Sequence, residues 1–269
     1  MPIGIFDSGI GGISVLKQFV RYLPYESYVY LGDTARVPYG NRSEEIVKSY
    51  SEECTEFLLK KGVKLIVVAC NTVSSIALDT IRSLSGGIPV IGMIQPAVAA
   101  ALRSSVNRKI GIIGTRATIR SKAYEKTIAE LASGERIETE SVACPLFVPI
   151  IEEGLLDHEA TRLLANDYLA QFRTNGVDSL IMACTHYPLL RQLFGELLPG
   201  INLIDSGEHA AVSAIRTLAE MGALAPEGKS YVPVPKIEFF VTDIPYTFLE
   251  VAQRFLGFSV GTPQKISFE

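Results

Sequence analysis

Two cysteines lie in nearly the same sequence context in the two halves of the chain. Cys70 and Cys184 each follow an apolar run that ends in alanine, and each precedes a polar residue and a segment with helical spacing. In open α/β sheets, ligands bind beyond the carboxyl ends of the strands. A thiol placed there faces the N-terminus of the next helix, which favours the thiolate. Both residues are candidates for proton transfer, because a thiolate is a usable base and a thiol a usable acid near neutral pH.

A structural role is the main alternative for any single cysteine, which is more often a small buried apolar residue than a reactive one. We expect that role for Cys54, on the apolar face of an expected helix, and for Cys144, within the apolar run 142–147. The repeated context favours the functional interpretation for Cys70 and Cys184. Two thiols on opposite sides of a substrate suit the inversion of a carbon that bears a hydrogen. One removes a proton from one face while the other returns a proton to the opposite face.

Two further residues are placed to assist these thiols. Asp7 ends the first expected strand, and His186 lies two residues beyond Cys184. Alternatives stay open for both, since Asp7 could cap the expected helix 13–23 and a lone histidine is often a turn residue. The turn 8–12 is rich in glycine, but Ser14 stands where a dinucleotide-binding motif needs its last glycine. The turn is either a site for a carboxylate or phosphate group or a plain tight turn.

Apolar, largely β-branched runs alternate with amphipathic segments along the chain. Several runs are apolar at every position, as in strands buried on both faces, so the alternation predicts an α/β fold with mostly parallel sheets. The expected strands are 3–6, 28–31, 65–69, 90–94, 110–113, 180–183, 202–204 and 237–241. The clearest helix is expected to begin at an Asn41 cap and to end at Gly62. A second helix is expected over 72–84.

A faint internal repeat divides the chain. Residues 3–6 resemble 110–113, and the segment around Cys70 resembles the segment around Cys184, in the same order and at nearly equal offsets. We therefore predict two related α/β domains; if they face each other, the two thiols flank one site. The first domain would comprise 1–96 plus 207–269, and the second 97–206.

Composition excludes several classes of protein. With 269 residues, 48% hydrophobic and 20% charged, the chain is neither disordered, collagen-like nor a coiled coil. A net charge of −4 without a basic block argues against nucleic acid as a partner. No segment has the pattern of a signal peptide or membrane span, so we expect a cytoplasmic location with reduced thiols. The four cysteines form no Cys-x-x-Cys pair and the three histidines are scattered, so no metal is expected.

Taken together, these segments resemble the glutamate racemases of the cofactor-independent aspartate/glutamate racemase family, over nearly the whole chain. The resemblance rests on five motifs: Gly4–Gly12 (GIFDSGIGG), Leu31–Gly40 (LGDTARVPYG), Ala69–Thr72 (ACNT), Cys144–Gly154 (CPLFVPIIEEG) and Ala183–Pro188 (ACTHYP). The second motif is the most specific. No motif position departs from the family in a way that puts activity in doubt.

The resemblance implies two α/β domains with the active site in the cleft between them and the C-terminal segment packed on the first domain. It also implies roles for individual residues. Cys70 would act on D-glutamate and Cys184 on L-glutamate, and Asp7, Glu152 and His186 would assist them. The residues implied to line the substrate site are Asp7, Ser8, Tyr39, Gly40, Asn71, Thr72, Thr185 and His186, with Thr115 and Thr118 as additions. No pyridoxal phosphate or other cofactor is implied. The product, D-glutamate, would serve peptidoglycan synthesis, and with it cell wall biogenesis and cell shape. A homodimer is common in the family, although nothing in the sequence identifies one.

Two alternatives remain at this point. The first is a racemase of aspartate or a related acid on the same fold, because only the motifs favour glutamate. A decarboxylase on this fold needs one thiol, so the second cysteine counts against it. The second alternative is a non-catalytic two-domain protein that binds an anionic ligand. Iodoacetamide separates these classes, since rapid labelling of Cys70 and Cys184, slowed by glutamate, indicates the enzyme.

Overall fold

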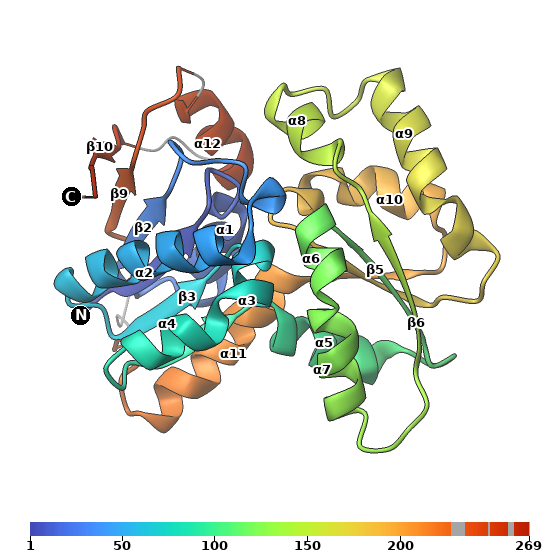
Figure 1. Ribbon diagram of the computed structural model, residues 1–269, viewed down its shortest axis with the longest axis horizontal. Coiled ribbons are helices and arrows are strands. Elements are labelled where there is room, and N and C mark those ends of the chain that lie inside the picture. The colour runs from blue at the N-terminus through green and yellow to red at the C-terminus, as the bar shows by residue number, and fades with distance from the viewer. Residues whose placement is uncertain (227–234, 247, 258–260, 269) are drawn as a thin grey trace.

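A computed structural model describes residues 1–226, 235–246, 248–257 and 261–268. The chain forms two β-sheets with helices on both faces, and the sheets lie side by side in Figure 1. Every strand pair among the described residues runs parallel. The predicted α/β class with mostly parallel sheets is therefore confirmed.

The first sheet has the strand order β10-β9-β2-β1-β3-β4 and the second has the order β6-β5-β7-β8. The strands of the first sheet are β1 (Ile3–Asp7), β2 (Tyr28–Gly32), β3 (Leu65–Val68), β4 (Val90–Gly92), β9 (Ile237–Val241) and β10 (Gln264–Lys265). Those of the second are β5 (Lys109–Gly114), β6 (Glu138–Ala143), β7 (Ser179–Ala183) and β8 (Asn202–Asp205).

Helices connect these strands and cover them. The α-helices are α1 (Ile13–Tyr22), α2 (Glu44–Lys60), α3 (Asn71–Ile76), α4 (Leu78–Leu84), α5 (Ile94–Ser104), α6 (Arg116–Ser121), α7 (Ala123–Leu131), α8 (Phe147–Glu152), α9 (Glu159–Leu169), α10 (Arg191–Leu197), α11 (Ser206–Glu220) and α12 (Phe248–Leu256). Short 3-10 helices are η1 (Tyr39–Asn41), η2 (Ala170–Arg173) and η3 (Tyr187–Leu190).

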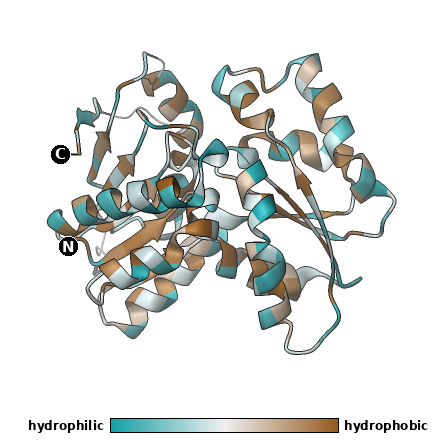
Figure 2. Ribbon diagram, viewed as in Figure 1, coloured by the Kyte–Doolittle hydropathy of each residue, from teal (hydrophilic) through white to brown (hydrophobic). Residues whose placement is uncertain are grey.

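Most residues of the central strands are hydrophobic, as Figure 2 shows, and side chains from alternate positions enter different cores. Ile3 and Ile5 belong to a core that contains residues of α1, whereas Phe6 belongs to a core that contains residues of α2. The first of these cores is continuous with residues of the second sheet, such as Met182. A shared core of this kind holds the two sheets in contact.

The internal repeat is visible in the topology. Four strands in each sheet are arranged in the same way: the order is β2-β1-β3-β4 in the first sheet and β6-β5-β7-β8 in the second. The predicted boundaries near Pro96 and Gly207 fall in the first turns of α5 and α11, which follow the equivalent strands β4 and β8. The division into 1–96 plus 207–269 and 97–206 stays a prediction, and residues 227–234, 247, 258–260 and 269 of it lie outside the described residues.

Several predicted boundaries are wrong for local reasons. The cap of α2 is Ser43, whose hydroxyl accepts from the Ile46 amide, while Asn41 belongs to η1. The predicted helix 72–84 is two helices, because the backbone leaves helical geometry at Ala77. Strand β6 was not expected, since an edge strand with a polar sequence lacks the apolar run of its neighbours. No helix in the described ranges is long and apolar enough to cross a membrane.

Candidate active site

Cys70 and Cys184 occupy equivalent places in the two sheets. Cys70 lies just beyond the carboxyl end of β3 and precedes α3, and Cys184 lies just beyond β7 and precedes η3. Their exposed fractions are 7% and 6%. The charge of Cys184 contributes to raising the pKa of Cys70, so the two thiols are electrostatically coupled. The structure thus brings together residues that are far apart in the sequence.

The surroundings of Cys70 favour the neutral thiol. Burial, followed by the negative charge of Asp7, raises its pKa to about 12. The Ser8 hydroxyl lies 3.3 Å from the sulfur, and the amide of Val73, in the first turn of α3, also interacts with it; both act against that rise. The helix terminus therefore offers the thiolate only partial compensation for its burial.

Asp7 ends β1 and is 1% exposed. Its Oδ2 accepts a hydrogen bond of 3.0 Å from the Gly9 amide, while its buried Oδ1 has no partner among the described residues. Burial raises the pKa of this carboxyl, and the amides of Gly12 and Gly9 and the charge of His186 oppose the rise. The alternative that Asp7 caps α1 is wrong, because the cap position is Gly12. An unpartnered buried oxygen is free to bind a substrate group.

Cys184 has a different set of neighbours. Its sulfur lies 3.9 Å from Nδ1 of His186, and Nε2 of that ring lies 2.9 Å from Oε1 of Glu152. Burial lowers the pKa of His186, but hydrogen bonds to Cys184 and Glu152 and their charges outweigh it and raise the pKa to about 10. Helix α8 presents Glu152 at its last position, where the side chain is 45% exposed. The imidazole ring thus lies between the Cys184 sulfur and the Glu152 carboxyl group.

Glycines let the two halves approach each other beside the thiols. A Cβ added to Gly11 would lie 2.3 Å from Cε1 of His186 and 2.4 Å from the Thr185 hydroxyl. A Cβ added to Gly12 would lie 2.4 Å from the Cβ of Asp7. The Ser14 hydroxyl, which occupies the position a dinucleotide motif gives to glycine, donates a 2.6 Å hydrogen bond to the Thr185 carbonyl. This loop therefore packs against the second half of the molecule.

Three threonine hydroxyls meet across the boundary of the halves. Thr72 lies 3.0 Å from Thr115 and 3.2 Å from Thr118, and the latter two are 3.0 Å apart, measured between Oγ1 atoms. Thr115 also caps α6 by accepting from the Thr118 amide. Thr72 lies in the first turn of α3, and its hydroxyl is directed at the other two.

Asn71 is held from two sides. Its Oδ1 accepts a 2.5 Å hydrogen bond from Tyr124 of α7, and its Nδ2 lies 3.5 Å from the Ser206 hydroxyl at the start of α11. Sequence reasoning missed Tyr124 and Ser206. Ser206 could have been found, because it follows a strand next to β7 and so lies at the same carboxyl edge. Tyr124 lies inside a helix and gave no such signal.

Tyr39 and Gly40 have different partners at the site. The Tyr39 hydroxyl donates to the buried carboxylate of Asp33, and its ring packs in the core of the first sheet. Gly40 instead lies against the second half, since a Cβ there would be 3.2 Å from that of Thr115. Only the backbone of this turn is therefore available at the boundary of the halves.

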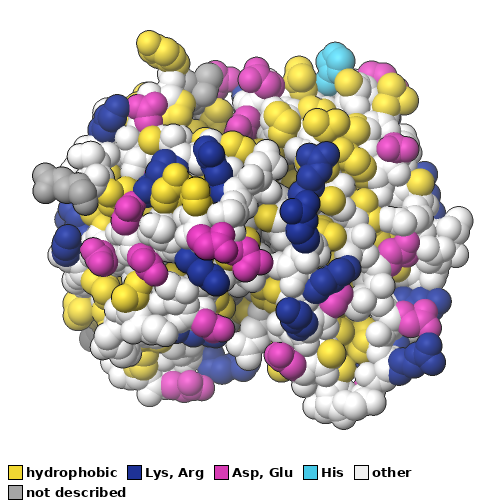
Figure 3. All heavy atoms as spheres, in the orientation of Figure 1, with side chains coloured by type: hydrophobic (Ala, Val, Ile, Leu, Met, Phe, Trp, Pro, Cys, Tyr) yellow, Lys and Arg dark blue, Asp and Glu magenta, His cyan; other side chains and the backbone are white. Residues whose placement is uncertain are grey.

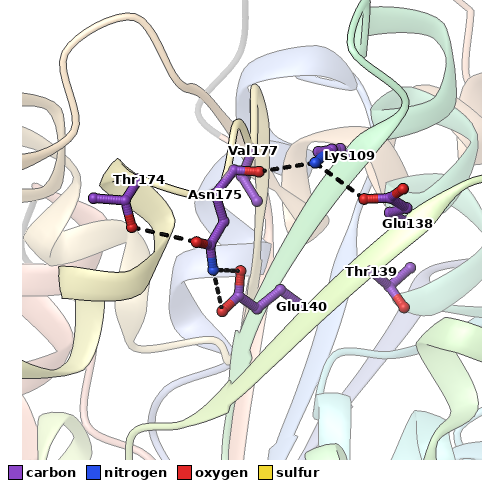
Figure 4. Close-up of a pocket in the computed structure, with 7 residues that line it drawn as sticks. All are labelled: Lys109, Glu138, Thr139, Glu140, Thr174, Asn175 and Val177. Carbon is purple, nitrogen blue, oxygen red and sulfur yellow. Dashed lines mark hydrogen bonds and ion pairs between the residues drawn. The ribbon is translucent and has the colours of Figure 1, made fainter.

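The remaining cysteines and one surface pocket lie elsewhere. Cys54 and Cys144 are fully buried, and burial raises the pKa of both thiols. The pocket in Figure 4 has a volume of about 430 Å³ and lies at the amino ends of β5 and β6, opposite the thiols. Its polar groups pair with one another, as Asn175 does with Glu140. No group of three or more His, Cys, Asp or Glu within the described ranges could hold a metal ion.

The sequence pattern of the Asp/Glu/Hydantoin racemase family matches residues 3–214. The chain therefore belongs to this family. It is 46% identical over 257 residues to the glutamate racemase of Chlorobaculum tepidum, covering 95% of this chain and 92% of that one. It is 43% identical over 268 residues to the glutamate racemase of Geobacter metallireducens, covering 99% and 97%.

Solved structures agree with this assignment. Glutamate racemase from Francisella tularensis in complex with D-glutamate is 36% identical, with a TM-score of 0.90 over 100% of this chain and 98% of that chain. Glutamate racemase from Thermus thermophilus in complex with beta-chloro-D-alanine is 43% identical, with a TM-score of 0.86 over 99% and 96%. An aspartate racemase homologue from Pyrococcus horikoshii, at 18% identity and a TM-score of 0.61, shares the fold alone.

Proposed function

We propose that this protein interconverts L-glutamate and D-glutamate by moving the α-proton between two thiols. The observation that carries the proposal is the placement of Cys70 and Cys184 beyond equivalent strands of two related halves. The relatives named glutamate racemase, matched over nearly their full length, support glutamate as the substrate. A racemase of aspartate or a related acid remains the second candidate, and its relatives share only the fold.

From L-glutamate, the Cys184 thiolate takes the α-proton and the Cys70 thiol donates a proton to the opposite face. The C–H bond breaks on one side and a new one forms on the other, so only the configuration of the carbon changes. From D-glutamate the roles reverse. The His186 imidazolium favours a thiolate at Cys184, since it lies beside it and has Glu152 behind it. The raised pKa of Asp7 suits a carboxyl that exchanges a proton with neighbouring groups near Cys70.

Substrate binding is proposed for the polar groups around the thiols. The chain has no excess of positive charge, and Figure 3 shows acidic and basic side chains interspersed on one face. A dicarboxylate is then held by hydroxyl, amide and backbone N–H groups. We assign this role to Ser8, Asn71, Thr72, Thr115, Thr118, Thr185 and the backbone of Tyr39 and Gly40. The unpartnered Oδ1 of Asp7 is suited to the substrate ammonium group.

Circular dichroism tests the proposal directly. Without added cofactor, the purified protein should bring the circular dichroism signal of L-glutamate and that of D-glutamate to zero. In deuterated water, deuterium should replace the α-hydrogen. Aspartate serves as the comparison substrate. Racemisation of aspartate with none of glutamate would favour the second candidate. Absence of both activities, with slow alkylation of all four cysteines, would indicate a binding protein.

The cellular role follows from the product. D-Glutamate made by this protein would supply peptidoglycan synthesis, in support of the cell wall and cell shape. We place the reaction in the cytoplasm, where free thiols stay reduced. A homodimer stays a prediction, which sedimentation of the purified protein would test.

A further inference from the structure

Helix α12 reaches from the C-terminal segment to the helix that carries Glu152. Nη1 of Arg254 donates hydrogen bonds to the carbonyl oxygens of Ile151 at 3.2 Å and Glu152 at 3.3 Å. Carbonyl groups at a helix C-terminus carry partial negative charge and favour a cation. In Figure 1, α12 and α8 lie on opposite sides of the boundary between the halves. The guanidinium fixes the end of a six-residue helix at the residue that pairs with His186.

The next residue of α12 contacts His186 itself. Phe255 is 2% exposed, and its ring centroid lies 5.4 Å from that of His186 with the ring planes at 90°. Perpendicular aromatic pairs at this distance are favourable. With Cys184 near Nδ1, Glu152 at Nε2 and Phe255 against the ring, the imidazole is held in one orientation.

A glycine makes this contact possible. Gly154 has a φ of +76°, and a Cβ added there would lie 2.7 Å from Nη2 of Arg254. Glu250, one turn earlier on α12, orients the same nitrogen at 2.9 Å. The motif Cys144–Gly154 therefore supplies Glu152 and also, two residues later, the space that Arg254 occupies.

We propose that Arg254 and Phe255 are positioning residues for the His186–Glu152 pair, so that the Cys184 side of the site is complete only with α12 docked. Arg254 acts through the α8 backbone and Phe255 through the imidazole ring. The kinetic part of this proposal rests on the proposed function of Cys184. Helix α12 lies beyond residue 214, where the family pattern ends.

The test uses Arg254→Met and Phe255→Leu, which keep much of the packing volume. The matched control is Gln253→Ala, an exposed position on the same helix. The direct readout is the titration of histidine Cε1–H resonances by NMR. The charged groups facing His186 are Cys184, Glu152 and Asp7, and the first two raise its pKa to about 10. Both variants should lower that midpoint by at least about one unit relative to the Gln253→Ala control.

Kinetics provide the second readout. Both variants should lower kcat/KM for the two enantiomers by the same factor, about tenfold, because a misplaced imidazole serves Cys184 poorly in either direction. Arg254→Lys, which can still donate to the carbonyl oxygens, should recover part of the loss. Gly154→Ala should reproduce the Arg254→Met effect from the other side of the contact.

Two outcomes would overturn the proposal. One is an unchanged His186 midpoint in both variants. The other is a loss of activity that Arg254→Lys does not recover and that is matched by faster labelling of Cys54 and Cys144, which would show general unfolding instead. The NMR titration needs no turnover, so it still decides the proposal if the wild-type protein fails to racemise glutamate.

Discussion

The two thiol environments differ although the two halves share one strand order. Cys70 has a hydroxyl and a carboxyl as its polar neighbours, and burial holds its pKa at about 12. Cys184 has an imidazole backed by a carboxylate. The first environment favours the neutral thiol, whereas the second places an imidazole with a raised pKa beside the sulfur. Under the proposed function, Cys70 is therefore ready to donate a proton, which is its part in the direction from L- to D-glutamate.

The largest expected effect comes from removing either thiol. Cys70→Ala and Cys184→Ala should each reduce racemisation by at least about 10³-fold, because each direction needs both an acid and a base. Because the equilibrium constant between enantiomers is unity, kcat/KM must fall equally in both directions. Polarimetry measures this loss, with Cys54→Ala as the buried control that keeps activity.

Isotope exchange in the same variants tells the thiols apart. Cys184→Ala retains Cys70 and should still exchange the α-hydrogen of D-glutamate with deuterated water without inverting it. Cys70→Ala should do the same for L-glutamate. Proton NMR follows the exchange. Equal exchange of both enantiomers by one variant would break the assignment of one thiol to each face.

Removing the imidazole should have the next largest effect. His186→Asn should lower kcat/KM by about 10²-fold, and Glu152→Gln by less, since it leaves the ring in place. The raised pKa of His186 also predicts a change in stability. Stability from its charged form is fully present below the unfolded pKa of 6.5 and is lost as pH rises through about 10. In urea unfolding, His186→Asn should not show this loss of stability as pH rises. A pH profile of stability identical to that of the wild type would contradict the ion pair.

Asp7→Asn should separate activity from stability on the Cys70 side. The pKa of Asp7 is raised above 3.8, so its contribution to stability is present at low pH and lost as pH rises through the folded value. Above the unfolded pKa of 3.8, burying this carboxyl group therefore lowers the free energy of unfolding. The free energy of unfolding of the variant should be roughly 1–3 kcal/mol higher than that of the wild type, while its kcat should be about tenfold lower. Denaturant unfolding at pH 7 and pH 4 tests this expectation, because the gain in free energy of unfolding should be smaller at pH 4.

Ser8→Ala should have the smallest effect. It removes the hydroxyl 3.3 Å from the Cys70 sulfur, which opposes the rise in that thiol's pKa. We expect kcat to fall about threefold, with the alkaline limb of the rate profile moving to higher pH. Ser83→Ala, on the exposed surface of α4, is the matched control.

Sequence patterns predicted the parts of this molecule whose signal is local. The strand that ends at Asp7 and the strands that precede Cys70 and Cys184 are buried on both faces, so their apolar runs gave a clear signal. The polar edge strand Glu138–Ala143 and the break at Ala77 depend on neighbours that no local pattern reveals. The same limit applied to the site.

Long-range contacts account for what the sequence did not indicate at the site. Tyr124 reaches Asn71 across the boundary of the halves, and Phe255 reaches His186 from the end of the chain. Nothing near these aromatic residues marks them as different from core residues. Tyr39 shows the converse, since its motif predicted a place in the site and its side chain instead binds Asp33.

The burial of both thiols has a consequence for the catalytic cycle. Under the proposed mechanism, conversion of L-glutamate to D-glutamate leaves a proton on Cys184 and removes one from Cys70, so the protein ends in a different protonation form from the one that began. With exposed fractions of 7% and 6%, neither sulfur meets bulk water freely. The two free forms must interconvert before the next molecule of L-glutamate can react. At high substrate concentration this interconversion of the two free forms, and not the proton transfer, would limit the rate. The protonation form of the free protein would then depend on which enantiomer it converted last.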